Sequence, residues 1–336
     1  MNVLVTSVGR SNHLLRDIRR ALPTGGHLFA AEVSADAPAL NEADGAFVVP
    51  PCADRSYVDA LLHICATNDI RLVIPLNERE LGVIAEHRDR FVTIGALPVV
   101  SDIRVIALCE DKWQVNEFLA TCGLRGPRTW LSLSEALHAI RRGDLAYPVV
   151  VKPRFGSTSI GFEMPSNERE LHLVHELAVL RAPRSSIRPS PATPDESVLI
   201  QERVTGEEYG IDVINDLTGQ HVATLARRKL RMRSGSTDRA MTVMTDELAA
   251  LGRTLGTALG HVGPLDCDVF VAADSTPLVI DLNPRIGGGL PFSQMAGANL
   301  TRALVAWRSG EAFDPCALTA RLGVRVAKFD EFVTIA

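Results

Sequence analysis

The stretch LDCDVFVAADSTPLVIDLNPR, residues 265–285, decides the fold of this 336-residue chain. Apolar runs stand on both sides of the turn-forming residues 273–277, a pattern that predicts a β-hairpin. The midpoint between positions 268 and 281 falls inside that turn. A hairpin that closes symmetrically therefore places Asp268 directly opposite Asp281, on the same face of the ribbon.

Oxygen ligands gather on this predicted face. Asp268, Asp281 and the amide of Asn283 form a hard-oxygen set that suits Mg²⁺, which takes one or two protein carboxylates together with phosphate oxygens. Arg285 follows two residues later and can bind phosphate with two N–H groups. A solvated acidic hairpin is the alternative. The glycine run 287–289 favours a binding site, because three glycines are costly unless the backbone approaches something closely.

The composition is that of a globular protein of two or three domains, 46% hydrophobic and 22% charged. Lys and Arg number 35 against 40 Asp and Glu, so we expect no nucleic-acid or membrane partner, and any anion site must be local. The sequence has no long apolar stretch and no basic leader, and we expect a cytoplasmic protein. Six scattered cysteines without a CxxC motif predict free thiols.

The first hundred residues alternate short β-branched runs with amphipathic segments, which predicts a parallel sheet with crossover helices. A dinucleotide site would need GxGxxG after the first strand. Gly9 is the only glycine there, which argues against a Rossmann oxidoreductase. The predicted strands are Val3–Val5, Leu28–Val33, Ala46–Val49, Leu72–Leu76 and Phe91–Ile94.

In the middle of the chain, Lys152 ends an apolar strand and precedes a loop of small residues. Such a loop can direct backbone N–H groups and hydroxyls at a polyphosphate, although taken alone it is a flexible turn. It is not a Walker A loop, because the lysine precedes the glycines. The segment 181–197, rich in Pro, Ser and Arg, predicts a mobile excursion. The loop residues concerned are Gly156, Ser157, Thr158, Ser159 and Gly161.

The last third predicts antiparallel strands and one long helix. A single helix is expected over 103–120, upstream of this region. Strands 198–204 and 209–215 are expected to pair through the short link at Thr205 and Gly206. Further expected elements are a strand over 221–225, a helix over 245–261, and a closing helix with a tail after Gly297.

At this point the residues resemble the ATP-grasp superfamily, specifically its carbamoyl-phosphate-synthase-like stand-alone carboxylate–amine ligases. The resemblance implies that Lys112, in Glu110-Asp111-Lys112, and Lys152 reach the phosphates of ATP beneath a glycine-rich flap at 156–161. Residues 201–209 resemble the hinge strand that holds adenine. The resemblance implies that Glu202 lies near the adenine edge, that Arg203 and Val204 bind adenine through their backbone, and that Glu208 takes the ribose hydroxyls.

The metal-ligand strands of the family resemble Asp268 and residues 281–285, where the family commonly reads Glu-x-Asn-Pro-Arg. Asp281 departs from that pattern by one methylene, which puts the metal spacing or preference in question. Asp266 shares the face of Asp268, and its role stays open. The basic run 227–233 resembles a segment near the triphosphate and offers Lys229, with a solvated basic strand as the alternative.

The resemblance implies a fold of class α/β plus α+β. A Rossmann-like pre-ATP-grasp domain is expected over 1–105, a linker helix with the lid over 106–200, and an antiparallel catalytic domain over 201–336. The implied chemistry uses ATP and two Mg²⁺ ions, with Mn²⁺ as a substitute, to form an amide through an acyl phosphate. Arg285, Lys152 and Lys229 are the implied catalytic residues.

Small-molecule carboxylate and amine substrates, either amino acids or small peptides, and a homodimer complete these expectations. The alternatives are another ATP-grasp outcome, such as carboxylation or carboxyl phosphorylation, and a non-catalytic ATP-binding regulator. Position suggests a few residues for the acceptor pocket. They are Asn77, Glu78, Arg231, Arg233 and the loop 287–294.

Overall fold

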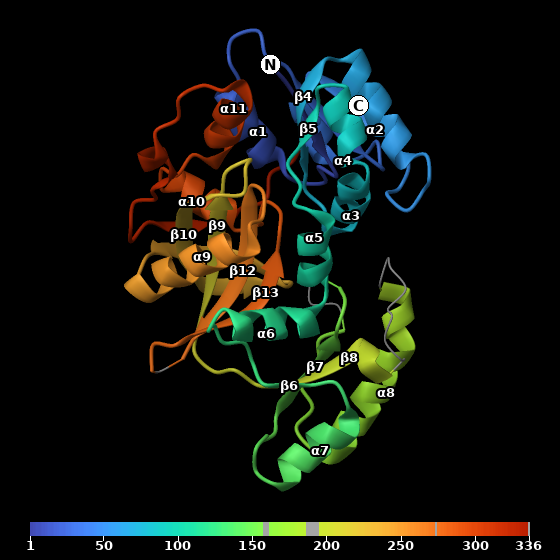
Figure 1. Cartoon of the computed structure of the whole chain (residues 1–336), viewed down its shortest axis with the longest axis vertical. Helices are drawn as coiled ribbons and strands as arrows, with labels where there is room; N and C mark the ends of the chain where they lie inside the picture. The colour runs from blue at the N-terminus through green and yellow to red at the C-terminus, as the bar shows by residue number, and fades with distance from the viewer. Residues whose placement is uncertain (157–160, 186–194, 273, 335–336) are drawn as a thin grey trace.

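The computed structural model describes residues 1–156, 161–185, 195–272 and 274–334. Three sheets organise this part of the chain: a five-stranded parallel sheet, a three-stranded antiparallel sheet and a six-stranded antiparallel sheet. Figure 1 shows the small sheet and its two helices at one end of the molecule, away from the parallel sheet. The predicted class, α/β plus α+β, is confirmed.

The parallel sheet has the strand order β3-β2-β1-β4-β5, so β1 lies between β2 and β4. One face packs against α1 and α11, and the other packs against α2, α3 and α4. Its strands are β1 (Asn2–Thr6), β2 (Leu28–Glu32), β3 (Gly45–Val48), β4 (Ile70–Pro75) and β5 (Leu97–Pro98). Its helices are α1 (Asn12–Ala21), the 3₁₀ turn η1 (Pro38–Glu42), α2 (Tyr57–Thr67), α3 (Glu78–Glu86) and α4 (Arg88–Thr93).

The expected strand over Phe91–Ile94 is wrong, because these residues lie in and just after α4. Phe91 is fully buried, whereas Val92 and Ile94 are 45% and 41% exposed. An apolar run of four residues does not distinguish a strand from a helix that buries one side chain per turn. The fifth strand comes later, at Leu97–Pro98.

The expected helix over 103–120 is two helices, α5 (Ile103–Glu110) and α6 (Lys112–Thr121). Asp111 separates them. Its backbone is extended, and its carboxylate accepts hydrogen bonds from the N–H groups of Trp113 and Gln114. A side chain that caps a new helix start explains the break.

The small sheet has the order β6-β8-β7 and is covered by α7 and α8. The expected pairing of 198–204 with 209–215 is wrong, because the first strand joins this sheet and the second joins the six-stranded one. Gly206 has a φ of +151°, and a Cβ there would lie 2.2 Å from the carbonyl oxygen of Val271, so the chain crosses between sheets through a tight passage that requires glycine. The elements are β6 (Thr129–Trp130), α7 (Leu133–Arg141), β7 (Val149–Pro153), α8 (Glu168–Ser185), the 3₁₀ turn η2 (Asp195–Ser197) and β8 (Val198–Glu202).

The expected excursion over 181–197 is corrected at both ends, since α8 continues to Ser185 and η2 begins at Asp195. Residues 186–194 lie outside the described part of the chain.

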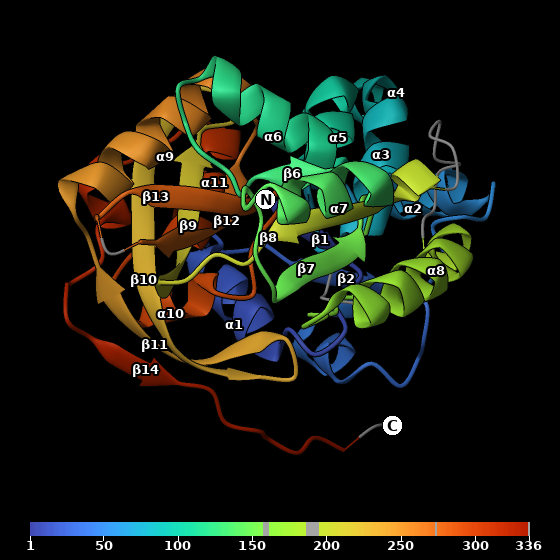
Figure 2. The ribbon, with the colours of Figure 1, turned by 90° about the horizontal axis from the view of Figure 1, so that it is seen from below.

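The six-stranded sheet has the order β13-β12-β9-β10-β11-β14. Its apolar face packs against α5, α6 and α9, and its other face carries charged residues. Figure 2, which views the molecule from the small-sheet end, shows the small sheet in front of the parallel sheet. The elements are β9 (Glu207–Asn215), β10 (His221–Arg233), β11 (Ser236–Val243), α9 (Asp246–Leu259), β12 (Pro264–Val271), β13 (Pro277–Asn283), α10 (Leu290–Met295), α11 (Leu300–Ser309), the 3₁₀ turn η3 (Pro315–Leu318) and β14 (Arg325–Ala327).

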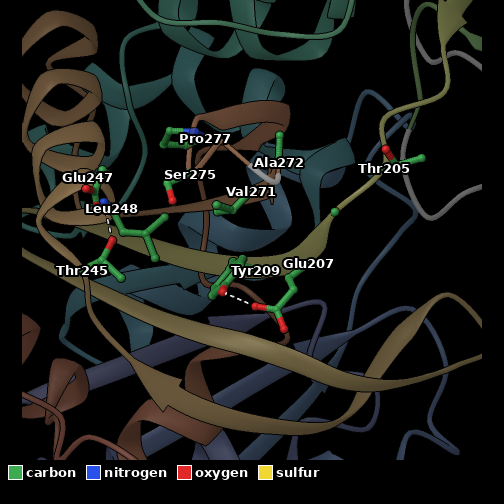
Figure 3. A pocket seen from close by; sticks show the side chains of 11 residues that line it. Thr205, Glu207, Tyr209, Thr245, Glu247, Leu248, Val271, Ala272, Ser275 and Pro277 are labelled. Atoms are coloured by element: carbon green, nitrogen blue, oxygen red, sulfur yellow. Dashed lines mark hydrogen bonds between the residues drawn. The ribbon is translucent and has the colours of Figure 1, made fainter.

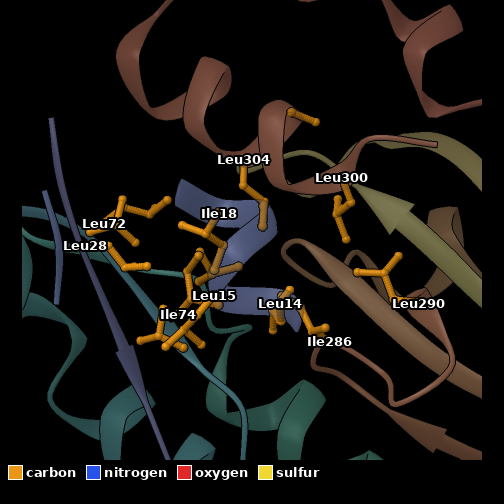
Figure 4. Close-up of a cluster of buried hydrophobic side chains, with 14 of the residues drawn as sticks. Leu14, Leu15, Ile18, Leu28, Leu72, Ile74, Ile286, Leu290, Leu300 and Leu304 are labelled. Carbon is orange, nitrogen blue, oxygen red and sulfur yellow. The ribbon is translucent and has the colours of Figure 1, made fainter. Parts of the chain in front are cut away.

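The tail after α11 is more ordered than expected, because β14 extends the sheet along β11. A three-residue strand carries too short a pattern to be predicted. One core cluster joins the two large sheets. Ile286 and Leu290, which follow β13, lie with Leu14, Ile18 and Ile74 of the parallel-sheet region (Figure 4).

Candidate active site

The hairpin β12–β13 has the predicted register. Asp268 pairs with Asp281, and Asp266 pairs with Asn283 on one side and with Asp212 of β9 on the other. Alternation along β12 places Asp266 and Asp268 on the same face, while Cys267 points into the apolar core. The predicted placement of Asp268 opposite Asp281 is thereby confirmed.

Three lysines from different elements meet at the Asp268 end of this face. The Nζ of Lys229, on β10, lies 2.7 Å from Asp268 Oδ1 and 2.6 Å from Glu208 Oε1. The Nζ of Lys112 lies 3.4 Å from Asp281 Oδ1. We call this group the lysine cluster. It comprises Lys112, Lys152, Lys229, Glu208, Asp268 and Asp281.

Lys152, on β7, is 9% exposed. It has no ion-pair partner within 4 Å among the residues that the structure describes. Burial, followed by the neighbouring positive charge of Lys112, lowers the pKa of Lys152 to about 8. A buried ammonium group without a described ion-pair partner, such as that of Lys152, is suited to bind an anion such as phosphate.

Lys112 is held in place by residues that the sequence interpretation did not use. It is the first residue of α6, directly after the cap residue Asp111. Asp111 accepts two hydrogen bonds of 2.7 Å from the guanidinium of Arg154, and both side chains are buried. The Lys112 ammonium also donates to the carbonyl of Gly156 at 2.5 Å. The signal was present in the sequence, since Asp111 precedes Lys112 and Arg154 follows Lys152 by two residues.

The oxygen set fits a divalent cation. Asp281 Oδ1 is buried and accepts no hydrogen bond from the described residues, and its contact is the ion pair with Lys112 at 3.4 Å. Among the described residues no group of three or more His, Cys, Asp or Glu side chains could hold a metal. The candidate protein ligands are two carboxylates and the Asn283 amide, and phosphate oxygens and water would supply the rest, as Mg²⁺ commonly requires.

A second group of charges lies at the Asp266 end of the same face. Arg227 donates to Asp212 at 2.5 Å and to Asp266 at 3.3 Å. Arg285 donates to the other oxygen of Asp266 at 3.0 Å, and its Nε donates to Glu78 Oε1 at 3.0 Å. We call this group the arginine chain. In order it comprises Glu78, Arg285, Asp266, Arg227 and Asp212.

The arginine chain explains the glycine run. A Cβ at Gly289 would lie 1.9 Å from Arg227 Nη2, and a Cβ at Gly287 would lie 2.4 Å from Asp266. The close approach expected of this run is therefore to the protein's own buried charges. Both oxygens of Asp266 accept hydrogen bonds from arginines, so Asp266 is committed to this chain and not to the oxygen set of Asp268.

The hinge residues lie between the small sheet and β9. Glu202 ends β8, and its carboxylate accepts hydrogen bonds from the backbone and side chain of Arg128 at 2.9 and 2.6 Å. Arg203 and Val204 follow in the link to β9. Of the flap residues, Gly156 and Gly161 are described, both with positive φ. Ser157, Thr158 and Ser159 lie outside the described residues.

The expected acceptor residues separate into two places. Asn77 caps α3, and Glu78 contacts Arg285. Arg231 and Arg233 lie along the exposed β10–β11 ribbon, where Arg233 pairs with Asp330 at 3.2 Å instead of facing the arginine chain.

A cavity of about 510 Å³ lies elsewhere, on the α9 side of the sheet (Figure 3). Tyr209 donates a 2.7 Å hydrogen bond to Glu207 in its wall. Tyr209 and Val271 belong to the opposite face from Asp268, so this cavity is separate from the lysine cluster. The six cysteines are free, as predicted, and none of the described helices is long and apolar enough to cross a membrane.

Comparisons with known proteins define the class. Residues 3–100 match the family model "PylC-like, N-terminal domain", and residues 194–332 match the model "ATP-grasp in the biosynthetic pathway with Ter operon". Over residues 194–332 the chain is thus similar to ATP-grasp proteins. The resemblance read from the sequence is confirmed at this level.

Curated relatives agree with the match to an ATP-grasp family model. The chain is 24% identical over 215 residues to the carbamoyl phosphate synthase large chain of Campylobacter jejuni, covering 62% of this chain and 19% of that one. The large chain of Beutenbergia cavernae is 27% identical over 221 residues, covering 62% and 18%. The chain thus spans less than a fifth of these relatives.

Among solved structures, the biotin carboxylase domain of 2-oxoglutarate carboxylase from Hydrogenobacter thermophilus has a TM-score of 0.72 at 18% identity, covering 93% of this chain and 70% of that one. N5-carboxyaminoimidazole synthetase from Staphylococcus aureus, complexed with ADP, has a TM-score of 0.70 at 15% identity, covering 93% and 78%. At this identity the likeness shows the ATP-grasp fold alone.

Proposed function

We propose that this protein is an ATP-dependent carboxylate–amine ligase. The γ-phosphoryl group of ATP passes to a substrate carboxylate, and an amine then displaces phosphate from the acyl phosphate, which leaves an amide, ADP and phosphate. The observation that carries the proposal is the pairing of Asp268 with Asp281 among three lysines from three elements. Phosphoryl transfer depends mainly on positioning and charge neutralisation, which this arrangement supplies.

On this proposal Lys112 and Lys152 contact the phosphates, beneath the flap that includes Gly156 and Gly161. The hinge residues Glu202, Arg203 and Val204 read the adenine edge, because an extended strand offers alternating donors and acceptors. Glu208 takes the ribose hydroxyls. Lys229 bridges Glu208 and Asp268 in this structure, so nucleotide binding frees its ammonium for the transferred phosphoryl group.

Asp268, Asp281 and Asn283 are the proposed holders of two Mg²⁺ ions, for which Mn²⁺ substitutes. When bound, the ions neutralise charge on the phosphate oxygens. Arg285 points toward Asp266 and Glu78, so its proposed catalytic role is on the acceptor side, where its guanidinium orients the anionic substrate carboxylate for attack on the γ-phosphorus.

The proposed domains correspond to the three sheets. The pre-ATP-grasp domain covers 1–105 and holds β1–β5, and the linker and lid begin at 106. The proposed lid covers 106–200 and the catalytic domain 201–336, and the pairing of β8 with β6 and β7 supports a division close to the end of β8. A lid that closes over the lysine cluster keeps water from the acyl phosphate.

An ADP-release screen of carboxylate and amine pairs, with mass spectrometry of the products, tests the proposal. We expect ADP formation that needs both substrates, an amide product, and a hydroxamate when hydroxylamine replaces the amine. Amino acids and small peptides come first in the screen. Bicarbonate-dependent ADP release without an amine would indicate carboxylation, and ATP binding without turnover would indicate a regulator.

The proposed quaternary state is a homodimer in the cytoplasm, with small molecules as the only other partners. The Hydrogenobacter domain is described as a dimer in its complex with MgADP, ADP and bicarbonate, which supports this choice. Light scattering after size-exclusion chromatography measures the mass directly, and a mass near 36.4 kDa would contradict it.

A further inference from the structure

The arginine chain alternates in sign and has carboxylates at both ends. Glu78, Asp266 and Asp212 supply three negative charges, and Arg285 and Arg227 supply two positive charges. The Asp212 end is sealed, since its side chain is 1% exposed, whereas the Glu78 side chain is 19% exposed. A ligand can therefore extend this chain only at Glu78, and the group that continues the alternation is a cation.

The position of Glu78 is that of a ligand site in an open α/β sheet. Strand order reverses between β1 and β4, and ligands of such sheets bind outside the carboxyl ends of the strands at this point. Glu78 is the first residue of α3, which starts three residues after β4 ends. A capping box between Asn77 and the fully buried Glu80 fixes the helix start, and therefore the backbone of Glu78.

Arg285, the partner of Glu78, is also held in place by its neighbours. Arg285 reaches across from the loop after β13, and Ile286 next to it is anchored in the core shared with the parallel sheet (Figure 4). Arg285 Nε and Nη2 both donate to the same oxygen of Glu78, Oε1. Within the described residues, the second oxygen, Oε2, has no hydrogen-bond partner. One acceptor of a fixed and partly exposed carboxylate thus stays available.

From this geometry we infer that Glu78 Oε2 binds the ammonium group of the amine substrate and accepts the proton that this group loses before the neutral amine attacks the acyl phosphate. This makes Glu78 a specificity residue for amines that are cationic at neutral pH. The inference rests on the proposed ligase function. Arg285 keeps Oε1 and holds the carboxylate in place. A charge-assisted hydrogen bond of this kind lowers KM for a cationic amine, whereas an uncharged nucleophile gains nothing from the carboxylate.

The test uses full-length protein, the carboxylate that forms a hydroxamate in the screen, and two nucleophiles. One is the cationic amine that turns over best, and the other is hydroxylamine, which is uncharged at neutral pH. In Glu78→Gln we expect KM for the cationic amine to rise about 10- to 100-fold. Hydroxamate formation is expected to stay within about threefold of the wild-type rate.

Glu135→Gln is the matched control, since Glu135 is an exposed glutamate in the first turn of α7, in the small-sheet region. It should leave both rates unchanged. An unaltered KM for the amine in Glu78→Gln would overturn the inference. So would an equal loss with both nucleophiles, which would make Glu78 only a positioning residue for Arg285. Absence of hydroxamate from the wild type would instead contradict the ligase proposal.

Discussion

Asp268 and Asp266 stand two residues apart on the same face of β12, yet their surroundings differ. Asp268 meets the point charge of Lys229, and its side chain is 38% exposed. Asp266 is held by two guanidinium groups, and its side chain is 16% exposed. A lysine ammonium is a point charge on a flexible stem, whereas an arginine guanidinium donates from a rigid fork. The lysine cluster is thus built to exchange its partners for a nucleotide and metal, and the arginine chain is built to keep its partners.

The largest expected effect comes from removing an oxygen ligand in the lysine cluster. Asp281→Asn should reduce ADP release about 10³-fold. The variant loses a proposed Mg²⁺ ligand, and the charge of the transferred phosphoryl group is then no longer neutralised. Thermal stability should change little, since Asp281 Oδ1 accepts no hydrogen bond from the described residues and meets Lys112 only at 3.4 Å. Asp274→Asn, in the exposed turn of the same hairpin, is the control. Wild-type turnover in Asp281→Asn would remove this residue from the site.

Substitutions in the arginine chain should lower the stability of the protein. Arg227 is 2% exposed, and replacing it with Leu leaves Asp212 buried without its partner. We expect a loss of about 3–5 kcal/mol in the free energy of unfolding, measured by urea denaturation. The double variant Arg227→Leu with Asp212→Asn should recover part of it. A single variant as stable as the wild type would show that the two regions do not differ in this way.

Arg285 belongs to the arginine chain by its contacts and to the proposed mechanism by its role. Arg285→Lys keeps the charge but cannot replace the fork that binds Asp266 and Glu78. Turnover at saturating substrates should fall about 10- to 100-fold with a small change in Tm. Undiminished turnover would take Arg285 out of the chemistry.

The smallest expected effect concerns Lys152, whose buried charge lowers the stability of the wild-type protein at neutral pH. Its folded pKa, about 8, lies below its usual value of 10.5, so the unfolded chain binds more protons between these values. Stability should therefore rise with pH from about 8 to about 10.5 through this group. Lys152→Gln should be more stable than the wild type at pH 7 by about 1–3 kcal/mol, and the gap should close toward pH 10. A gap that is independent of pH would contradict the cause.

The lysine cluster could be predicted from the sequence because its acids Asp268 and Asp281 lie in one hairpin. The register of Asp268 against Asp281 follows from local alternation and turn position. The contact of Glu78 with Arg285 joins residues 207 positions apart, and no local pattern specifies it. The basic run shows the same limit. It predicted cations at one site, but strand alternation sends Lys229 to Asp268 and Arg227 into the buried arginine chain, while Arg233 remains on the surface.

Calorimetric titration of ATP into the wild type and into Asp268→Asn, with and without Mg²⁺, tests the central claim most directly. The account predicts binding to the wild type that Mg²⁺ strengthens at least tenfold, and loss of that Mg²⁺ dependence in the variant. Equal affinity in the two proteins, or binding to the wild type that ignores Mg²⁺, would contradict it.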